Sequence, residues 1–198
     1  MAIYNYQLKS GNSHLTGYDI AKELARQCVV QFGAVRGYGT GIGKGSCCAA
    51  VAVVPTQDFP APRPLTGIGA DSQPQYGQNP LPYAVVFGNS QLASGGLDLG
   101  PLGGHAERAA LTAAGNNNLN LYLLNNTDAV LYVELTPCPP CQNWLAGNGE
   151  GVPNPFTFKK INLHVWWSYP YPDKSGIKNM QDFHKSSLQN QLNTVNSW

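Results

Sequence analysis

Short apolar runs alternate along this chain with segments in which apolar residues recur at helical spacing. The apolar runs predict strands at residues 47–54, 84–87, 129–136 and 161–169. The helical patterns cover residues 17–32, 105–114, 137–145 and 177–192. Strands that alternate with helices favour one mixed sheet with helices packed against it. The sequence therefore predicts an α/β fold, a three-layer α/β/α sandwich around one mixed sheet.

Local patterns predict where some of these elements end and which faces they bury. Glycine and asparagine predict a turn at residues 88–90, after the second strand. Gly115 predicts the end of the second helix. Alternation along the third strand places Leu131, Val133 and Leu135 on one face of the sheet.

Length and charge limit the classes of protein to consider. The chain has 198 residues, which predicts one domain over residues 1–198, with a Pro/Gly-rich insertion at about 55–82. Charged residues make up 12% and the net charge is +1, which excludes a strongly basic nucleic-acid binder but not a local patch. No run of 18 apolar residues and no signal-peptide pattern is visible, so no membrane partner is expected.

A glycine-rich segment at residues 36–45 resembles a phosphate-binding loop only superficially. The Walker pattern requires glycine where Tyr38 stands, and serine or threonine where Gly45 follows Lys44. Both requirements fail, so we interpret this segment as a loop.

Three residues have the chemistry of zinc ligands and stand where helices are expected to begin: His105, Cys138 and Cys141. A Cys-x-x-Cys spacing lets both sulfurs reach one ion, and the start of a helix lowers the cost of a thiolate. Three protein ligands leave a fourth tetrahedral position for water, as in catalytic zinc sites. Glu107 can join this group only if His105 lies at the very first turn of its helix, because residues two apart otherwise diverge.

Other interpretations of the same residues remain open at this point. A closed structural zinc site would need a fourth ligand such as His164 or Cys48. A strand followed by Cys-x-x-Cys and a helix is also the thioredoxin context, but this leaves His105 and Glu107 without a role. The remaining cysteines, Cys28, Cys47 and Cys48, are interpreted as small core residues.

The chain resembles the cytidine deaminase-like superfamily in two motifs. It has His105-Ala106-Glu107 and, after an expected strand, Pro137-Cys138-Pro139-Pro140-Cys141. The zinc deaminase signature is H-x-E followed by P-C-x-x-C, so this is a match to a known pattern rather than a derivation. Glycines before His105 and the Pro-Cys-Pro-Pro-Cys sequence make the chain most similar to bacterial toxin-type deaminases.

The resemblance implies a Zn²⁺ ion held by His105, Cys138 and Cys141, with Glu107 as the general acid and base. Activated water would attack C4 of cytosine or C6 of adenine, and ammonia would leave. The resemblance further implies substrate contacts, for which the candidates are Asn89, Trp167, Tyr169 and Tyr171. For the two adjacent tryptophans, Trp166 and Trp167, one at least is expected to be core, because neighbours on a strand face opposite sides.

The expected substrate is cytosine in DNA, preferably single-stranded, because aromatic residues and nearby lysines after the last strand suit a stacked base and its phosphates. The alternatives are a free cytidine or nucleotide deaminase, an RNA adenosine deaminase, and a non-catalytic, zinc-stabilised binding module. The toxin resemblance also implies a cytoplasmic site of action, delivery as part of a secreted protein, and an immunity protein as partner.

Overall fold

The computed structural model describes residues 2–33, 47–55, 85–89, 105–116, 127–148 and 162–198. The glycine-rich segment and, apart from residue 55, the expected insertion lie outside these ranges.

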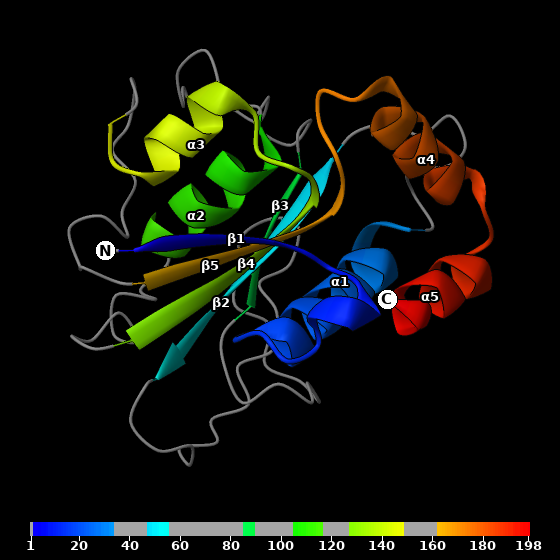
Figure 1. The fold of residues 1–198 in the computed structure, drawn as a ribbon, viewed down its shortest axis with the longest axis horizontal. Helices are drawn as coiled ribbons and strands as arrows, with labels where there is room; N and C mark the ends of the chain where they lie inside the picture. The colour runs from blue at the N-terminus through cyan, green and yellow to red at the C-terminus, as the bar shows by residue number, and fades with distance from the viewer. Residues whose placement is uncertain (1, 34–46, 56–84, 90–104, 117–126, 149–161) are drawn as a thin grey trace.

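The described residues form five strands, five α-helices and one short 3₁₀ helix (Figure 1). In chain order they are β1 (Ile3–Gln7), η1 (Ser10–Asn12), α1 (Tyr18–Phe32), β2 (Cys48–Pro55), β3 (Val85–Asn89), α2 (Ala106–Asn116), β4 (Thr127–Leu135), α3 (Pro139–Leu145), β5 (Asn162–Tyr169), α4 (Lys174–Lys185) and α5 (Leu188–Ser197). The strands make one sheet in the order β1-β5-β4-β2-β3. Strands β1, β5 and β4 are parallel, whereas β2 runs antiparallel to both β4 and β3. The predicted α/β class with a mixed sheet is confirmed.

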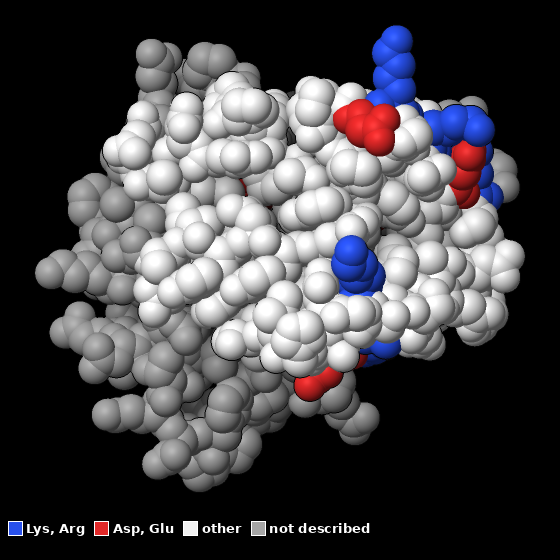
Figure 2. Space-filling model, viewed as in Figure 1, with Lys and Arg blue, Asp and Glu red and all other residues white. Residues whose placement is uncertain are grey.

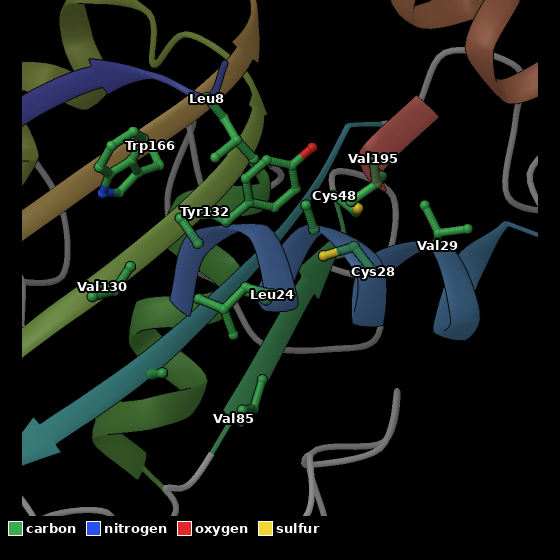
Figure 3. Close-up of a cluster of buried hydrophobic side chains, with 14 of the residues drawn as sticks. Leu8, Leu24, Cys28, Val29, Cys48, Val85, Val130, Tyr132, Trp166 and Val195 are labelled. Carbon is green, nitrogen blue, oxygen red and sulfur yellow. The ribbon is translucent and has the colours of Figure 1, made fainter. Parts of the chain in front are cut away.

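Helices lie on both faces of this sheet, because its central strands bury apolar residues on both sides. On one face α2 and α3 cover Leu131, Val133 and Val165 (Figure 1). On the other face α1 and α5 cover Tyr132 and Trp166 (Figure 3). The predicted common face of Leu131, Val133 and Leu135 is therefore confirmed.

The sequence-based prediction missed one strand and joined two helices into one. Strand β1 was not predicted, because Ile-Tyr-Asn-Tyr-Gln has no continuous apolar run and becomes a strand by pairing along β5. The single closing helix predicted at 177–192 is two helices, since α4 ends at Lys185 and α5 begins after Ser187. The Ser187 hydroxyl accepts a hydrogen bond from the Asn190 N–H and so caps a new helix.

Two glycines were wrongly predicted to end elements. Gly88 and Asn89 belong to β3 rather than to a turn, and Gly115 lies inside α2, which runs to Asn116. At Gly88 the backbone of α2 comes so close that a Cβ would lie 2.3 Å from the Ala106 carbonyl oxygen. Gly88 is therefore required for the close approach of strand and helix, which glycine in a strand often permits.

Charged side chains are sparse on the described surface. In Figure 2 most described atoms belong to uncharged residues, and blue and red atoms gather above α4. Among the described residues, no helix is long and apolar enough to cross a membrane.

We expect Gly88→Ala to destabilise the protein, because the new methyl group meets backbone atoms of Ala106 and Ala110, which cannot rotate away. Overpacking of this kind costs about 1–3 kcal/mol, which lowers the melting temperature by roughly 2–12 °C in a chain of this size. Thermal unfolding followed by circular dichroism measures the change. Gly11→Ala is the matched control, since no atom lies within 4 Å of a Cβ there; equal effects of the two changes would contradict the close contact.

Candidate metal centre

Helix α2 begins directly after His105, and this placement brings His105 and Glu107 to the same site. The His105 carbonyl oxygen accepts the Ala109 N–H at 3.0 Å, the first hydrogen bond of the helix. Glu107 is the second residue of α2 and is buried. His105 therefore lies at the very start of its helix, which is the condition for Glu107 to join the same group.

Helix α3 supplies the two thiols from its own start. Cys138 is the residue before the helix, and its extended backbone allows Pro139 and Pro140 to occupy the first helical positions. Cys141 lies in the first turn and is fully buried. The side-chain amide of Gln142 donates to the Pro137 carbonyl at 2.7 Å, which holds the start of the helix in place.

The four predicted donors form one group. The His105 Nδ1 atom lies 3.5 Å from Cys138 Sγ and 3.3 Å from Cys141 Sγ. One ligand atom from each of His105, Glu107, Cys138 and Cys141 lies within 4.8 Å of the others. Imidazole, thiolate and carboxylate are the usual zinc ligands, so this set could hold a metal ion and is compatible with zinc.

The alternative fourth ligands do not join this group. Among the described residues the group consists of the four donors above. Cys48 is buried in the cluster on the opposite face, beneath α1 (Figure 3), and the His164 ring stacks on Tyr4 at 5.0 Å. The prediction that Cys28, Cys47 and Cys48 are buried is confirmed.

Burial and nearby carboxylates raise the pKa values of two thiols in this region, Cys141 and Cys47. Burial raises the pKa of Cys141 far above its ordinary value, and the Glu107 carboxylate and the Cys138 thiol raise it further. Burial also raises the pKa of Cys47, with Glu134 and then Glu107 adding to the effect. A cation bound between the sulfurs would reverse this effect at Cys141, because it favours the thiolate.

A cavity of about 200 Å³ opens beside the donors His105, Glu107 and Cys138. Its other described walls come from four different segments: Cys47, Ala106, Leu135, Thr136 and Tyr171. The Thr136 N–H donates to the Tyr169 carbonyl at 2.9 Å, so the ends of β4 and β5 stay joined at the cavity. The volume is smaller than the roughly 300–1,000 Å³ of pockets for drug-sized ligands, and it suits a single small ring.

The predicted substrate residues lie in different places. Tyr171 lines the cavity. Trp167 packs against the cluster under α2 and α3, and Tyr169 packs on the other face against Phe183 and Trp198. Neither of these two is among the cavity walls that the structure describes. Asn89 ends β3 opposite Cys48, and its side chain lies outside the described part of the chain.

Two contacts near the site have no signal in the sequence. The Arg108 guanidinium lies over the Trp144 ring, 4.9 Å from its centroid, and so links α2 to α3. Arg108 is buried, where such a contact contributes about 2 kcal/mol. The second contact joins Glu134 of β4 to His184 of α4. Both contacts depend on which elements meet in the folded chain, which local sequence patterns do not reveal.

Searches against protein-family models, curated proteins and solved structures find no match to this chain.

We expect the protein to bind about one equivalent of Zn²⁺ or Co²⁺, and Cys138→Ser to weaken this binding by about 100-fold or more. Zinc binding of about 10–16 kcal/mol, shared by three protein ligands and one water, gives a loss of this size when one protein ligand is removed. Competition with a chromophoric chelator measures the affinity, and the cobalt–thiolate absorption identifies sulfur ligation. Cys28→Ser is the control, since Cys28 is buried on the opposite face. If both variants bound metal as the parent does, the assignment would be wrong.

Proposed function

We propose that this protein is a zinc-dependent deaminase of the cytidine deaminase-like superfamily that converts cytosine to uracil in single-stranded DNA. Within this proposal, the mixed sheet with helices on both faces is the three-layer α/β/α sandwich of that superfamily. The toxin origin and the immunity protein belong to the same proposal and rest on the resemblance in the motifs.

The observation that carries the proposal is the convergence of His105, Glu107, Cys138 and Cys141 in one group, three of whose members line one cavity. The member that does not line it is the buried Cys141. Three of these side chains suit a catalytic zinc ion, which has three protein ligands. The fourth is a carboxylate that faces the same cavity and is free to carry protons if it does not ligate the metal. A structural zinc site would need neither the cavity nor an additional acid.

The residues divide the chemistry between them. Zinc in such a site supplies a Lewis acid that makes water nucleophilic near neutral pH. Glu107 accepts the proton of the attacking water and delivers it to the departing amine, so that water and cytosine give uracil and ammonia. Because Glu107 is buried beside the cavity, bulk solvent does not compete for this proton.

Glu107→Ala should abolish deamination, by at least about 100-fold, because general acid–base catalysis contributes roughly 10²–10⁴-fold. The variant should keep its metal and its melting temperature, since His105, Cys138 and Cys141 remain. Turnover is measured as uracil by mass spectrometry, and metal content by elemental analysis. Glu23→Ala removes a carboxylate from α1 and serves as the control.

The substrates in this assay are single-stranded DNA, duplex DNA, RNA and free cytidine. Activity on free cytidine alone would contradict the nucleic-acid preference. A Glu107→Ala variant that deaminates at the parental rate would contradict the catalytic assignment. Loss of the metal in this variant would make Glu107 a fourth ligand, as in a zinc-stabilised binding module.

Tyr171 supports a polymeric substrate. Its side chain lines the cavity and is still 41% exposed, so its ring lies at the boundary between the site and solvent. Lys174 and Lys178 follow on the exposed surface of α4, where a nucleic-acid backbone would find positive charge. An extrahelical base entering the cavity would meet the aromatic ring first and the lysines with its neighbouring phosphates.

We expect Tyr171→Ala to raise the KM for single-stranded DNA by about tenfold, because stacking a base on an aromatic ring is worth roughly 1–3 kcal/mol. Steady-state kinetics on a single-cytosine oligonucleotide measures the effect. Tyr4 is a closely matched control, since it is also 41% exposed and lies on β1, outside the cavity walls. An equal effect of Tyr4→Ala, or none of Tyr171→Ala, would remove Tyr171 from the substrate site.

A further inference from the structure

A buried glutamate joins three elements next to the cavity. Glu134 on β4 is 1% exposed, and its Oε1 lies 3.1 Å from the Nε2 of His184 on α4. Its Oε2 accepts the backbone N–H of Cys48 at the start of β2, at 2.9 Å. His184 is 3% exposed. One carboxylate therefore holds a helix and two strands together through hydrogen bonds.

Two of these elements line the cavity right beside their contact with Glu134, whereas α4 contacts Glu134 in its last turn and adjoins the cavity at its first turn. Cys47 precedes Cys48, and Leu135 and Thr136 follow Glu134. Tyr171 lies just before α4. The first turn of α4 presses on the segment that bears Tyr171, since a Cβ on Gly176 would lie 2.1 Å from the Pro170 carbonyl oxygen. The first turn of α4 thus packs directly against the neighbour of Tyr171, while Glu134 contacts the last turn of the same helix through His184.

The pair has no part in the chemistry assigned to Glu107 and the ligands. Its net contribution to stability is small, because burying both groups costs their hydrogen bonds to water and offsets most of the energy of the new hydrogen bond. What such a pair does provide is a fixed geometry, since both oxygens of the carboxylate are directed at specific partners.

We infer that Glu134 and His184 are positioning residues that, through α4, set the separation between Tyr171 and Cys47 in the lining of the cavity. The expected effect of the pair on KM rests on the proposed function, whereas its expected effect on the separation of the two cavity-lining residues does not. The hydrogen bonds of Glu134 named here run to β2 and α4, whereas the donors stand at the starts of α2 and α3, so we expect zinc binding to persist when the pair is broken.

The geometry is tested by alkylation of Cys47 in the zinc-loaded protein, with peptide mapping by mass spectrometry. His184→Ala should speed alkylation of Cys47 by about tenfold, the change that corresponds to losing one hydrogen bond to a charged group. His184→Gln should restore slow alkylation, because its amide nitrogen can reach Glu134 as the imidazole Nε2 does. Met180→Ala is the matched control, since Met180 is buried on the same helix.

Steady-state kinetics of the same variants on single-stranded DNA distinguish a positioning role from a general loss of stability. His184→Ala should raise KM by about tenfold and leave kcat and zinc content unchanged, because a binding wall moves and the donors do not. His184→Gln should return KM toward the parental value. Met180→Ala should lower the melting temperature without changing KM.

Three results would overturn the inference: alkylation of Cys47 no faster in His184→Ala than in Met180→Ala, failure of His184→Gln to restore it, or a fall in kcat at constant KM. If the parent protein deaminates no substrate, the proposed function fails by itself. The alkylation rates then still decide whether the pair positions the cavity walls.

Discussion

Two helices must begin at the same place on one face of the sheet, and the rest of the site depends on this constraint. The donor side chains come from the beginnings of α2 and α3, so a shift of either helix by one residue would separate them. The shared apolar cluster under both helices and the Arg108–Trp144 contact fix their relative position. The site is thus a consequence of helix packing more than of any loop.

The donor group could be predicted because two short motifs match a known zinc signature and each stands where a helix begins. His105 and Cys138 directly precede their helices and Cys141 lies in a first turn, so the donors meet once both helices begin at one place. Strand β1, in contrast, exists through pairing with residues about 160 positions away, and no local pattern reveals such a partner. The same holds for Glu134, whose neighbours come from β2 and α4. Trp167 and Tyr169 were predicted as substrate contacts from the resemblance, and they pack against the apolar clusters on the two faces of the sheet.

Charge is used sparingly and in an unusual distribution. Only 12% of the residues are charged, yet Glu107, Arg108 and Glu134 are all buried within a short stretch of the chain. Burying such groups is costly unless each finds a partner, and here Arg108 lies over Trp144 and Glu134 bonds to His184. Arg108 and Glu134 are also the chain neighbours of Glu107 and Leu135, which line the cavity. This concentration of buried charged residues is typical of regions where a protein gives up stability to hold functional groups in place.

The seating of α2 on β3 at Gly88 also limits how this protein could be recombined with a homologue. The carbonyl of Ala106 and the backbone of Ala110 leave no room for a larger partner, so strand and helix are complementary as a unit. In a chimera that joined β3 from one parent to α2 from another, the strand and the helix would no longer fit at the start of α2, next to His105. A block exchanged from Val85 to Asn116 would keep that surface intact, which makes this segment the natural module for transplanting the site's first half.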